Sequence, residues 1–135
     1  MAAVFAGNLV GIYVQVDCAS ILANPQVDPS QVIFMNDNNA AGGSTGEGTD
    51  ELTTACHPGD TLTWTCVNMN PANGYTVQIL GIRNSTGNVF GKNPPSSTPA
   101  GYQGTVVSAG AETYQLNILV GGTTSYSWDP HISSS

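Results

Sequence analysis

Positive charge is almost missing from this chain. Only Arg83 and Lys92 of its 135 residues are cationic, against nine carboxylates, and charged residues together make 8% of the sequence. Ordinary proteins contain roughly a quarter charged residues. Nucleic acids and anionic membranes are bound through clustered Lys and Arg, so we expect neither among its partners. Amide and hydroxyl side chains fill the loops instead, and these pair with sugar hydroxyls or with a second copy at little cost in charge desolvation.

Long apolar runs and a dense set of cysteines are also lacking. No apolar run reaches the roughly 18 residues that a transmembrane helix needs, so we expect no membrane insertion. Residues 1–16 are apolar but contain no Lys or Arg and are interrupted by polar side chains, so no signal peptide is expected. The expected location is the cytoplasm, with inclusions there or release without a visible signal as alternatives. Three cysteines are too few for a disulfide framework.

Catalytic motifs are missing as well. The chain contains no GxSxG, HExxH, P-loop or dinucleotide fingerprint, and neither His57 nor His131 stands beside a recognisable nucleophile. We therefore expect that it is not an enzyme. The phrase from His57 to Asp60 is similar to one that opens a strand in cupredoxins. A blue-copper site needs two His and one Cys close together, and no Cys stands near His131, so a metal-binding cupredoxin-like protein is only a second alternative.

The chain does contain a clear pattern, in which apolar and polar residues alternate with a period of two. Apolar and polar residues alternate from Leu9 to Asp17, and similar segments rich in Val, Ile, Thr and Tyr recur between Gly and Pro turns. The expected strands are residues 9–17, 31–35, 61–68, 75–82, 103–108, 113–120 and 123–128. This spacing predicts one all-β domain over residues 1–135, with an N-terminal arm at 1–8. We expect an antiparallel β-sandwich of about seven to nine strands with jelly-roll or Greek-key-like connections, and one helical turn over 18–23 capped by Asp17.

Two segments carry the candidate site residues. The first is the long loop over residues 36–49 with the carboxylates that follow it, and the second is the end of the last expected strand. Their amides and carboxylates suit sugar hydroxyls, and their aromatic rings suit stacking on a sugar ring. The predicted sugar-binding residues are Asn36, Asp37, Asn38, Asp50, Tyr126, Trp128 and Asp129.

The same loop also offers oxygen ligands of the kind that calcium prefers. Asp37, Glu47 and Asp50 are the candidate calcium ligands, although the spacing fits no EF-hand loop; no other cofactor is expected. A solvated polar loop, and an aromatic plug at the sandwich end, are the alternative interpretations of the two segments.

Several phrases in this order resemble the AidA/PixA inclusion-body protein family. The resemblance covers nearly the whole chain, and it departs from the family at His131, where an aromatic residue is usual, and at Thr63, where a basic one is often found. The matching phrases are residues 12–22 (IYVQVDCASIL), Asn24-Pro25, residues 32–35, Asp50-Glu51-Leu52, Gly59-Asp60 with residues 61–64, and residues 127–132 (SWDPHI). The resemblance implies a small bacterial β-sandwich, often produced under population-density control. It also implies accumulation as intracellular inclusions, and lectin-like binding has been suggested within the group.

Composition and resemblance together predict a non-enzymatic protein that self-associates as a dimer or a larger oligomer and carries a lectin-like carbohydrate site. Self-association is expected at an exposed strand edge, because the lysines that normally block edge pairing are missing. A storage or inclusion protein without any ligand is the first alternative.

Overall fold

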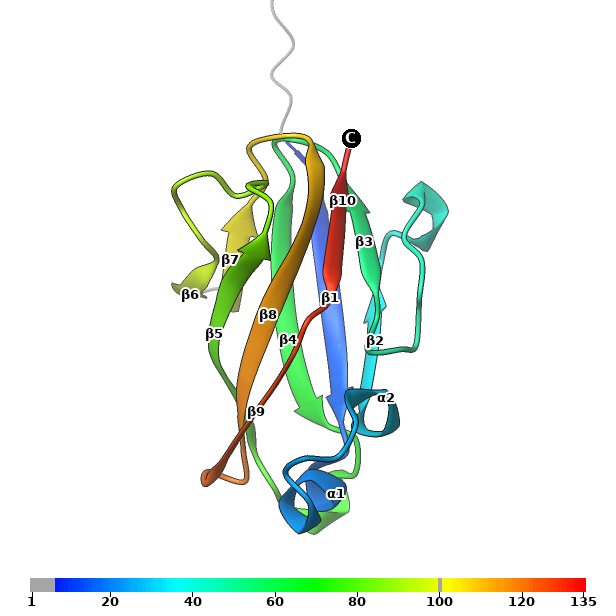
Figure 1. Cartoon of the computed structure of the whole chain (residues 1–135), viewed down its shortest axis with the longest axis vertical. Helices are drawn as coiled ribbons and strands as arrows, with labels where there is room; N and C mark the ends of the chain where they lie inside the picture. The colour runs from blue at the N-terminus through cyan, green and yellow to red at the C-terminus, as the bar shows by residue number, and fades with distance from the viewer. Residues whose placement is uncertain (1–6, 100) are drawn as a thin grey trace, which may run out of the picture.

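Two five-stranded sheets pack face to face in the computed structural model, which describes residues 7–99 and 101–135 except the side chains of residues 84 and 85 (Figure 1). Sheet A has the strand order β2 (Ile33–Asp37), β1 (Leu9–Val16), β4 (Thr61–Asn68), β7 (Gly101–Thr105) and β6 (Ser96–Thr98). Sheet B has the order β3 (Thr53–Cys56), β10 (His131–Ser134), β8 (Gly110–Val120) and β5 (Val77–Thr86), with β9 (Thr124–Trp128) also paired to β8. The short helices are α1 (Cys18–Ala23), α2 (Pro29–Val32) and the 3₁₀ turns η1 (Ala40–Gly42) and η2 (Pro71–Asn73).

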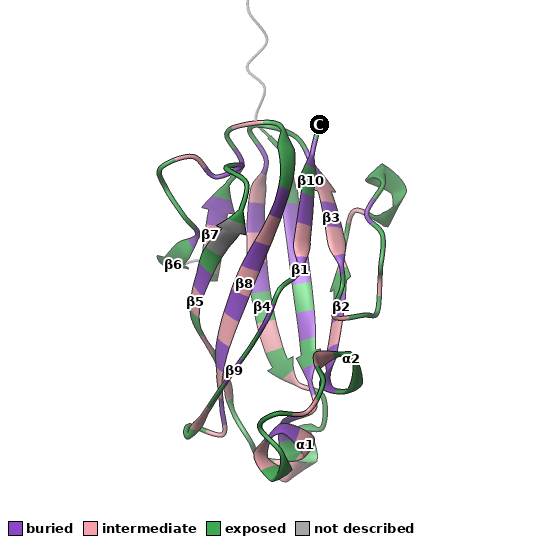
Figure 2. Ribbon diagram, viewed as in Figure 1, coloured by how far each residue is buried: buried purple, intermediate pink, exposed green. Residues whose placement is uncertain are grey.

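Alternation along the strands builds the core, as the bands of buried and exposed residues in Figure 2 show. On β1 every second residue from Val10 to Val16 is buried, and on β8 the same holds from Glu112 to Val120. Trp64 lies between the sheets, where its indole N–H donates to the Tyr114 hydroxyl at 3.1 Å. The core therefore consists of the inward faces of both sheets, as expected for a sandwich.

The predicted all-β sandwich is confirmed, with differences in detail. Two strand pairs, β1–β4 and β10–β3, are parallel, so the sheets are mixed and not purely antiparallel. Strands β3, β6 and β10 have only three or four residues each, too short for a visible alternation. The predicted strand start at residues 31–32 is the end of α2, because Asp28 caps a turn with Pro29 in its first position. The cap that Asp17 supplies to α1 is confirmed.

Residues 1–6 of the predicted N-terminal arm lie outside the described residues. Within residues 7–99 and 101–135, no helix is both long and apolar enough to cross a membrane.

The segment between β2 and β3, residues 38–52, closes one side of the sandwich, and we call it the edge loop. Its Thr49 carbonyl accepts the N–H of Met35 at 3.1 Å on β2. Its Thr45 exchanges two main-chain hydrogen bonds with Thr53 on β3, at 3.0 and 2.8 Å. The outer strands of both sheets are thus paired on this side, which leaves less open edge than the sequence predicted.

Glu112 is a carboxylic acid inside the core, with only 2% of its surface exposed. Its Oε1 accepts the N–H of Val89 at 2.9 Å, while its Oε2 is buried without a partner. The contact holds the turn that carries the fully buried Phe90 against β8. Burial raises the pKa of the Glu112 carboxyl, and the hydrogen bond from Val89 offsets part of this rise.

This raised pKa predicts a pH dependence of stability. The folded-state pKa of Glu112 lies above the value of about 4.3 for a Glu in the unfolded chain. The contribution of Glu112 to stability is therefore fully present below about pH 4.3 and is lost as pH rises through the folded-state pKa. Glu112→Gln keeps an acceptor for Val89 but cannot ionise, so its melting temperature should differ less between about pH 5 and pH 7 than that of the wild type. Asp129→Asn, which removes an exposed charge, should keep the wild-type difference. An unchanged difference in Glu112→Gln would contradict this role.

Candidate ligand-binding site

Of the predicted sugar-site residues at the end of β2 and the start of the edge loop, Asp37 and Asn38 hydrogen-bond to the main chain. The Asp37 N–H donates to Glu47 Oε1 at 2.8 Å, and Asp37 Oδ1 accepts the N–H of Asn39 at 2.9 Å. Asn38 Oδ1 accepts the N–H of Gly11 on β1 at 3.1 Å. Asn36 lies apart from them, exposed on the outer face of sheet A opposite Tyr13. One oxygen of each of Asp37, Glu47 and Asn38 thus accepts a main-chain N–H, while Asp37 Oδ2 and Glu47 Oε2 are buried without a hydrogen-bond partner among the described residues.

The predicted calcium ligands are not brought together as a set. Asp37 and Glu47 are adjacent, and burial, with the neighbouring Asp37 carboxylate, raises the pKa of Glu47. Asp50 instead lies near Glu51 and Asp28, and burial raises its pKa too. Nowhere in the described part of the chain do three or more His, Cys, Asp or Glu side chains form a group able to hold a metal.

The structure buries both of the rings that the sequence predicts to stack on a sugar ring. Trp128 is 5% exposed, and its indole N–H points at the sulfur of Met35, 3.2 Å away. Tyr126 is 6% exposed and packs beside Trp128 with ring centres 6.3 Å apart. The alternative of an aromatic plug describes both rings better. Asp129 is exposed in the link between β9 and β10.

The copper alternative is not supported by the positions of the two histidines. His131 and His57 stand at opposite ends of the parallel pair β10–β3, about 13 Å apart at the usual strand rise. His131 Nε2 contacts Glu51 Oε2 at 2.7 Å, and His57 Nδ1 contacts the Ser135 carbonyl at 2.7 Å. Among the described residues, no hydrogen bond joins either ring to a cysteine.

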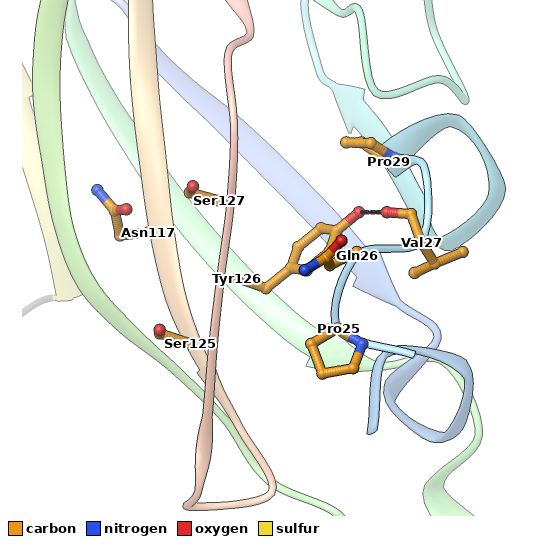
Figure 3. Close-up of a pocket in the computed structure, with 8 residues that line it drawn as sticks. All are labelled: Pro25, Gln26, Val27, Pro29, Asn117, Ser125, Tyr126 and Ser127. Atoms are coloured by element: carbon orange, nitrogen blue, oxygen red, sulfur yellow. Dashed lines mark hydrogen bonds between the residues drawn. The ribbon is translucent and has the colours of Figure 1, made fainter. Parts of the chain in front are cut away.

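A pocket of about 310 Å³ lies where the segment between α1 and α2 approaches β8 and β9 (Figure 3). We call this segment, residues 24–28 with Pro29 at the start of α2, the connector. The Tyr126 ring reaches from β9 to the connector beside Gln26, whereas Ser125 and Asn117 lie on the other side of the β9 ribbon. The pocket is lined by Pro25, Gln26, Val27, Pro29, Asn117, Ser125, Tyr126 and Ser127.

Local hydrogen bonds fix the connector in place. Asn24 accepts the N–H of Gln26 through its side chain at 3.1 Å and the N–H of Val27 through its carbonyl at 3.0 Å. The Tyr126 hydroxyl then donates to the Val27 carbonyl. Burial, with the carboxylates of Asp28 and Asp50 nearby, raises the pKa of Tyr126 to about 12, so this hydroxyl remains a donor at neutral pH.

Of the predicted residues, only Tyr126 lines this pocket, and it does so as a buried support. The other lining residues escaped prediction because Pro25 and Pro29 indicate turns in the sequence. Asn117, Ser125 and Ser127 are ordinary outward positions of two strands. Alternation does place Ser125 and Ser127 on one face of β9, but the register of β9 against β8 is needed to add Asn117.

The tyrosine anchor gives a testable prediction. Tyr126→Phe removes the hydroxyl and leaves the Val27 carbonyl without this donor, so we expect a loss of about 1 kcal/mol in the free energy of unfolding. Amide hydrogen exchange in residues 24–30 should become faster. Tyr75→Phe is the matched control, because the Tyr75 hydroxyl is on an exposed side chain and makes no hydrogen bond to the described residues. Equal effects of the two substitutions in urea unfolding would show that Tyr126 does not anchor the connector.

Comparison with known proteins shows the family and the fold relatives of this chain. Residues 8–126 match the model of a protein family described as a domain of unknown function, DUF8788. No curated protein matches the sequence. Among solved structures, the inclusion body protein PixA from Burkholderia cenocepacia J2315 aligns over 100% of both chains with a TM-score of 0.82 and 18% identity. The predicted resemblance to AidA/PixA proteins is therefore confirmed in the fold, and the chain belongs to the DUF8788 family.

Proposed function

We propose that this protein is a non-enzymatic, self-associating protein that packs into dense cytoplasmic assemblies of the inclusion-body type. The observation that carries the proposal is the distribution of charge. None of the described outward-facing side chains on the strands of either sheet is an Asp or Glu. The nine carboxylates lie in turns, in loops, at strand or helix ends, or inside the core: Asp17, Asp28, Asp37, Glu47, Asp50, Glu51, Asp60, Glu112 and Asp129.

This distribution matters because the chain carries a net charge of −7. Two copies that meet through a broad sandwich face keep their carboxylates at the rim, where water and salt screen them. The cores of protein interfaces are likewise depleted in charged residues and enriched in aromatic ones. A face-to-face contact therefore avoids the repulsion that the net charge would otherwise impose.

The outer face of sheet A is the better of the two faces for such a contact. Leu9, Tyr13 and Val67 lie on it with 62%, 55% and 45% of their surfaces exposed. The Tyr13 side chain lies over Gly11, with its hydroxyl oxygen and two ring carbons 3.1 to 3.3 Å from where a Cβ of Gly11 would stand. The ring thus extends the apolar surface along β1 between Leu9 and Val67. Exposed apolar surface of this kind marks interaction sites.

The strand edges are less suitable. The edge loop covers β2 and β3, β6 is only three residues long, and β5 has two bulges. Bulges and short strands are features that oppose edge-to-edge pairing. The proposed contact is therefore a face and not an edge, and the shared fold with a protein named as an inclusion body protein supports an assembling role.

A matched pair of charge substitutions tests the interface. Gln15 and Gln78 are both exposed, Gln15 on β1 in sheet A and Gln78 on β5 in sheet B. Gln15→Glu places a new carboxylate in the proposed contact, so the dissociation constant of self-association should rise about ten-fold or more. Gln78→Glu changes the net charge equally but should leave association nearly unchanged. Sedimentation velocity over a range of protein and salt concentrations measures both.

The opposite result, with Gln78→Glu dissociating the assembly and Gln15→Glu inert, would move the interface to sheet B. Protein that stays monomeric at high concentration would contradict self-association itself.

Carbohydrate binding is a second candidate function, favoured by the connector pocket. Its volume lies at the lower end of the range of about 300–1,000 Å³ for small-molecule sites. The rim offers the amides of Gln26 and Asn117 and the hydroxyls of Ser125 and Ser127, and Pro25 adds apolar surface. Amide and hydroxyl groups beside an apolar wall suit the alternating polar and apolar faces of a sugar ring.

A blocking substitution tests this candidate. Ser125→Leu fills the pocket from an exposed strand position, so binding of neutral oligosaccharides found on a glycan array should weaken about ten-fold or more. Ser133→Leu, at an exposed position of β10 in the same sheet, should bind as the wild type does. Calorimetry on folded protein measures the affinities. A blank array would rule out the carbohydrate candidate and leave the assembly proposal standing.

A further inference from the structure

A second hollow, of about 380 Å³, adjoins the connector pocket on the outer face of sheet B. Both hollows include Asn117 and Ser125 in their linings, and Figure 3 shows these two residues on the side of β9 away from the connector. We call the two hollows together the sheet B groove. It runs from the connector across β9 and β8 to β5. The second hollow is lined by Leu80, Gly81, Ile82, Arg83, Tyr102, Asn117 and Ser125.

An irregularity in β5 produces this second hollow. The register shifts between Ile79 and Gly81, and this bulge sets Gly81, which has no side chain, opposite Asn117 on β8. Tyr102 of sheet A reaches the same place, with its hydroxyl 4.0 Å from where a Cβ of Gly81 would stand. A bulged edge strand thus gives a depression with a phenol hydroxyl on its wall.

The groove carries polar groups that have no partner within the described part of the chain. Arg83 is exposed and makes no ion pair or hydrogen bond there, and the sole ion pair among described residues joins His131 to Glu51. The Tyr102 hydroxyl likewise makes no hydrogen bond to any residue that the structure describes. Asn117 donates through Nδ2 to Gln115 at 3.3 Å, which leaves its Oδ1 open.

We propose that the sheet B groove binds an oligosaccharide bearing a carboxylate, with a sugar ring in the connector pocket and the carboxylate on the Arg83 guanidinium. This inference rests on the carbohydrate candidate above and adds the charge of the ligand and the second half of its site. Arg83 is one of only two cations in a chain with nine carboxylates, yet no described outward-facing strand residue of sheet B is an Asp or a Glu, and the Glu51 carboxylate is paired with His131. Its guanidinium is therefore available to a ligand.

A carboxylate fits this environment better than a more highly charged group. A planar guanidinium binds one carboxylate through two parallel hydrogen bonds. A single Arg supplies no second cation for a dianion such as a phosphate monoester, which the net charge of −7 would repel more strongly. Tyr102 and Asn117 then provide a donor and an acceptor for neighbouring sugar hydroxyls.

The test compares a uronic-acid trisaccharide with its methyl ester, which has the same rings but no charge. Calorimetry on the full chain should show the acid binding about ten-fold more tightly than the ester, the factor expected for a charge-assisted hydrogen bond of the usual strength. Arg83→Gln should remove this difference and leave ester binding unchanged. Lys92→Gln, which removes the other cation from an exposed loop outside the groove, should keep the difference.

Each other outcome has a distinct meaning. Equal binding of acid and ester, lost in Ser125→Leu, would overturn the inference and keep the carbohydrate candidate. No binding of either ligand would overturn both. If Arg83→Gln and Lys92→Gln both removed the preference for the acid, that preference would come from general charge attraction. This result would overturn the specific role of Arg83. Equally tight binding of a tri-glutamate peptide would overturn the assignment to a saccharide.

Discussion

Main-chain pairing by the edge loop is the constraint on which the rest of this structure depends. A sandwich of two open sheets has exposed strand edges, and on one side a single loop pairs with β2 and β3 at once. The loop thereby ties the sheets together, with Asn39 Nδ2 donating to the Ala55 carbonyl at 2.7 Å and Ser44 Oγ accepting the Ala55 N–H at 2.9 Å. Several polar side chains of this loop therefore serve the fold.

The fold class could be predicted because alternation is local. Residues 9–16 and 61–68 show their buried faces in the sequence, and both form strands. Which strands become neighbours is set by contacts between distant residues, such as the parallel register of Leu9 with Thr61. A single sequence contains no local pattern from which that register can be predicted. Strand β10 was missed for a related reason, since its four residues gain their extended form from pairing with β3 and β8.

The candidate site depends on tertiary contacts more than the fold class does, as Tyr126 and Asp37 show. Tyr126 was identified as a ligand-facing residue, but its strand turns this side chain inward, and the ring supports the pocket from behind. Asp37 has the chemistry of a ligand, yet its nearest partners are the Asn39 N–H and a second carboxyl. Residue type indicates what a group can bind. Whether the protein's own main chain already occupies that group depends on the tertiary structure.

The two faces of the sandwich point in opposite directions, and this geometry has a consequence for valency. A pair of copies joined through their sheet A faces would carry one sheet B groove on each outer side, separated by the thickness of two sandwiches. Such grooves cannot both engage one flat surface. They would bridge two separate glycan chains, so that avidity would arise only where ligands approach from both sides. An assembly of this kind would cross-link a polymer rather than coat it.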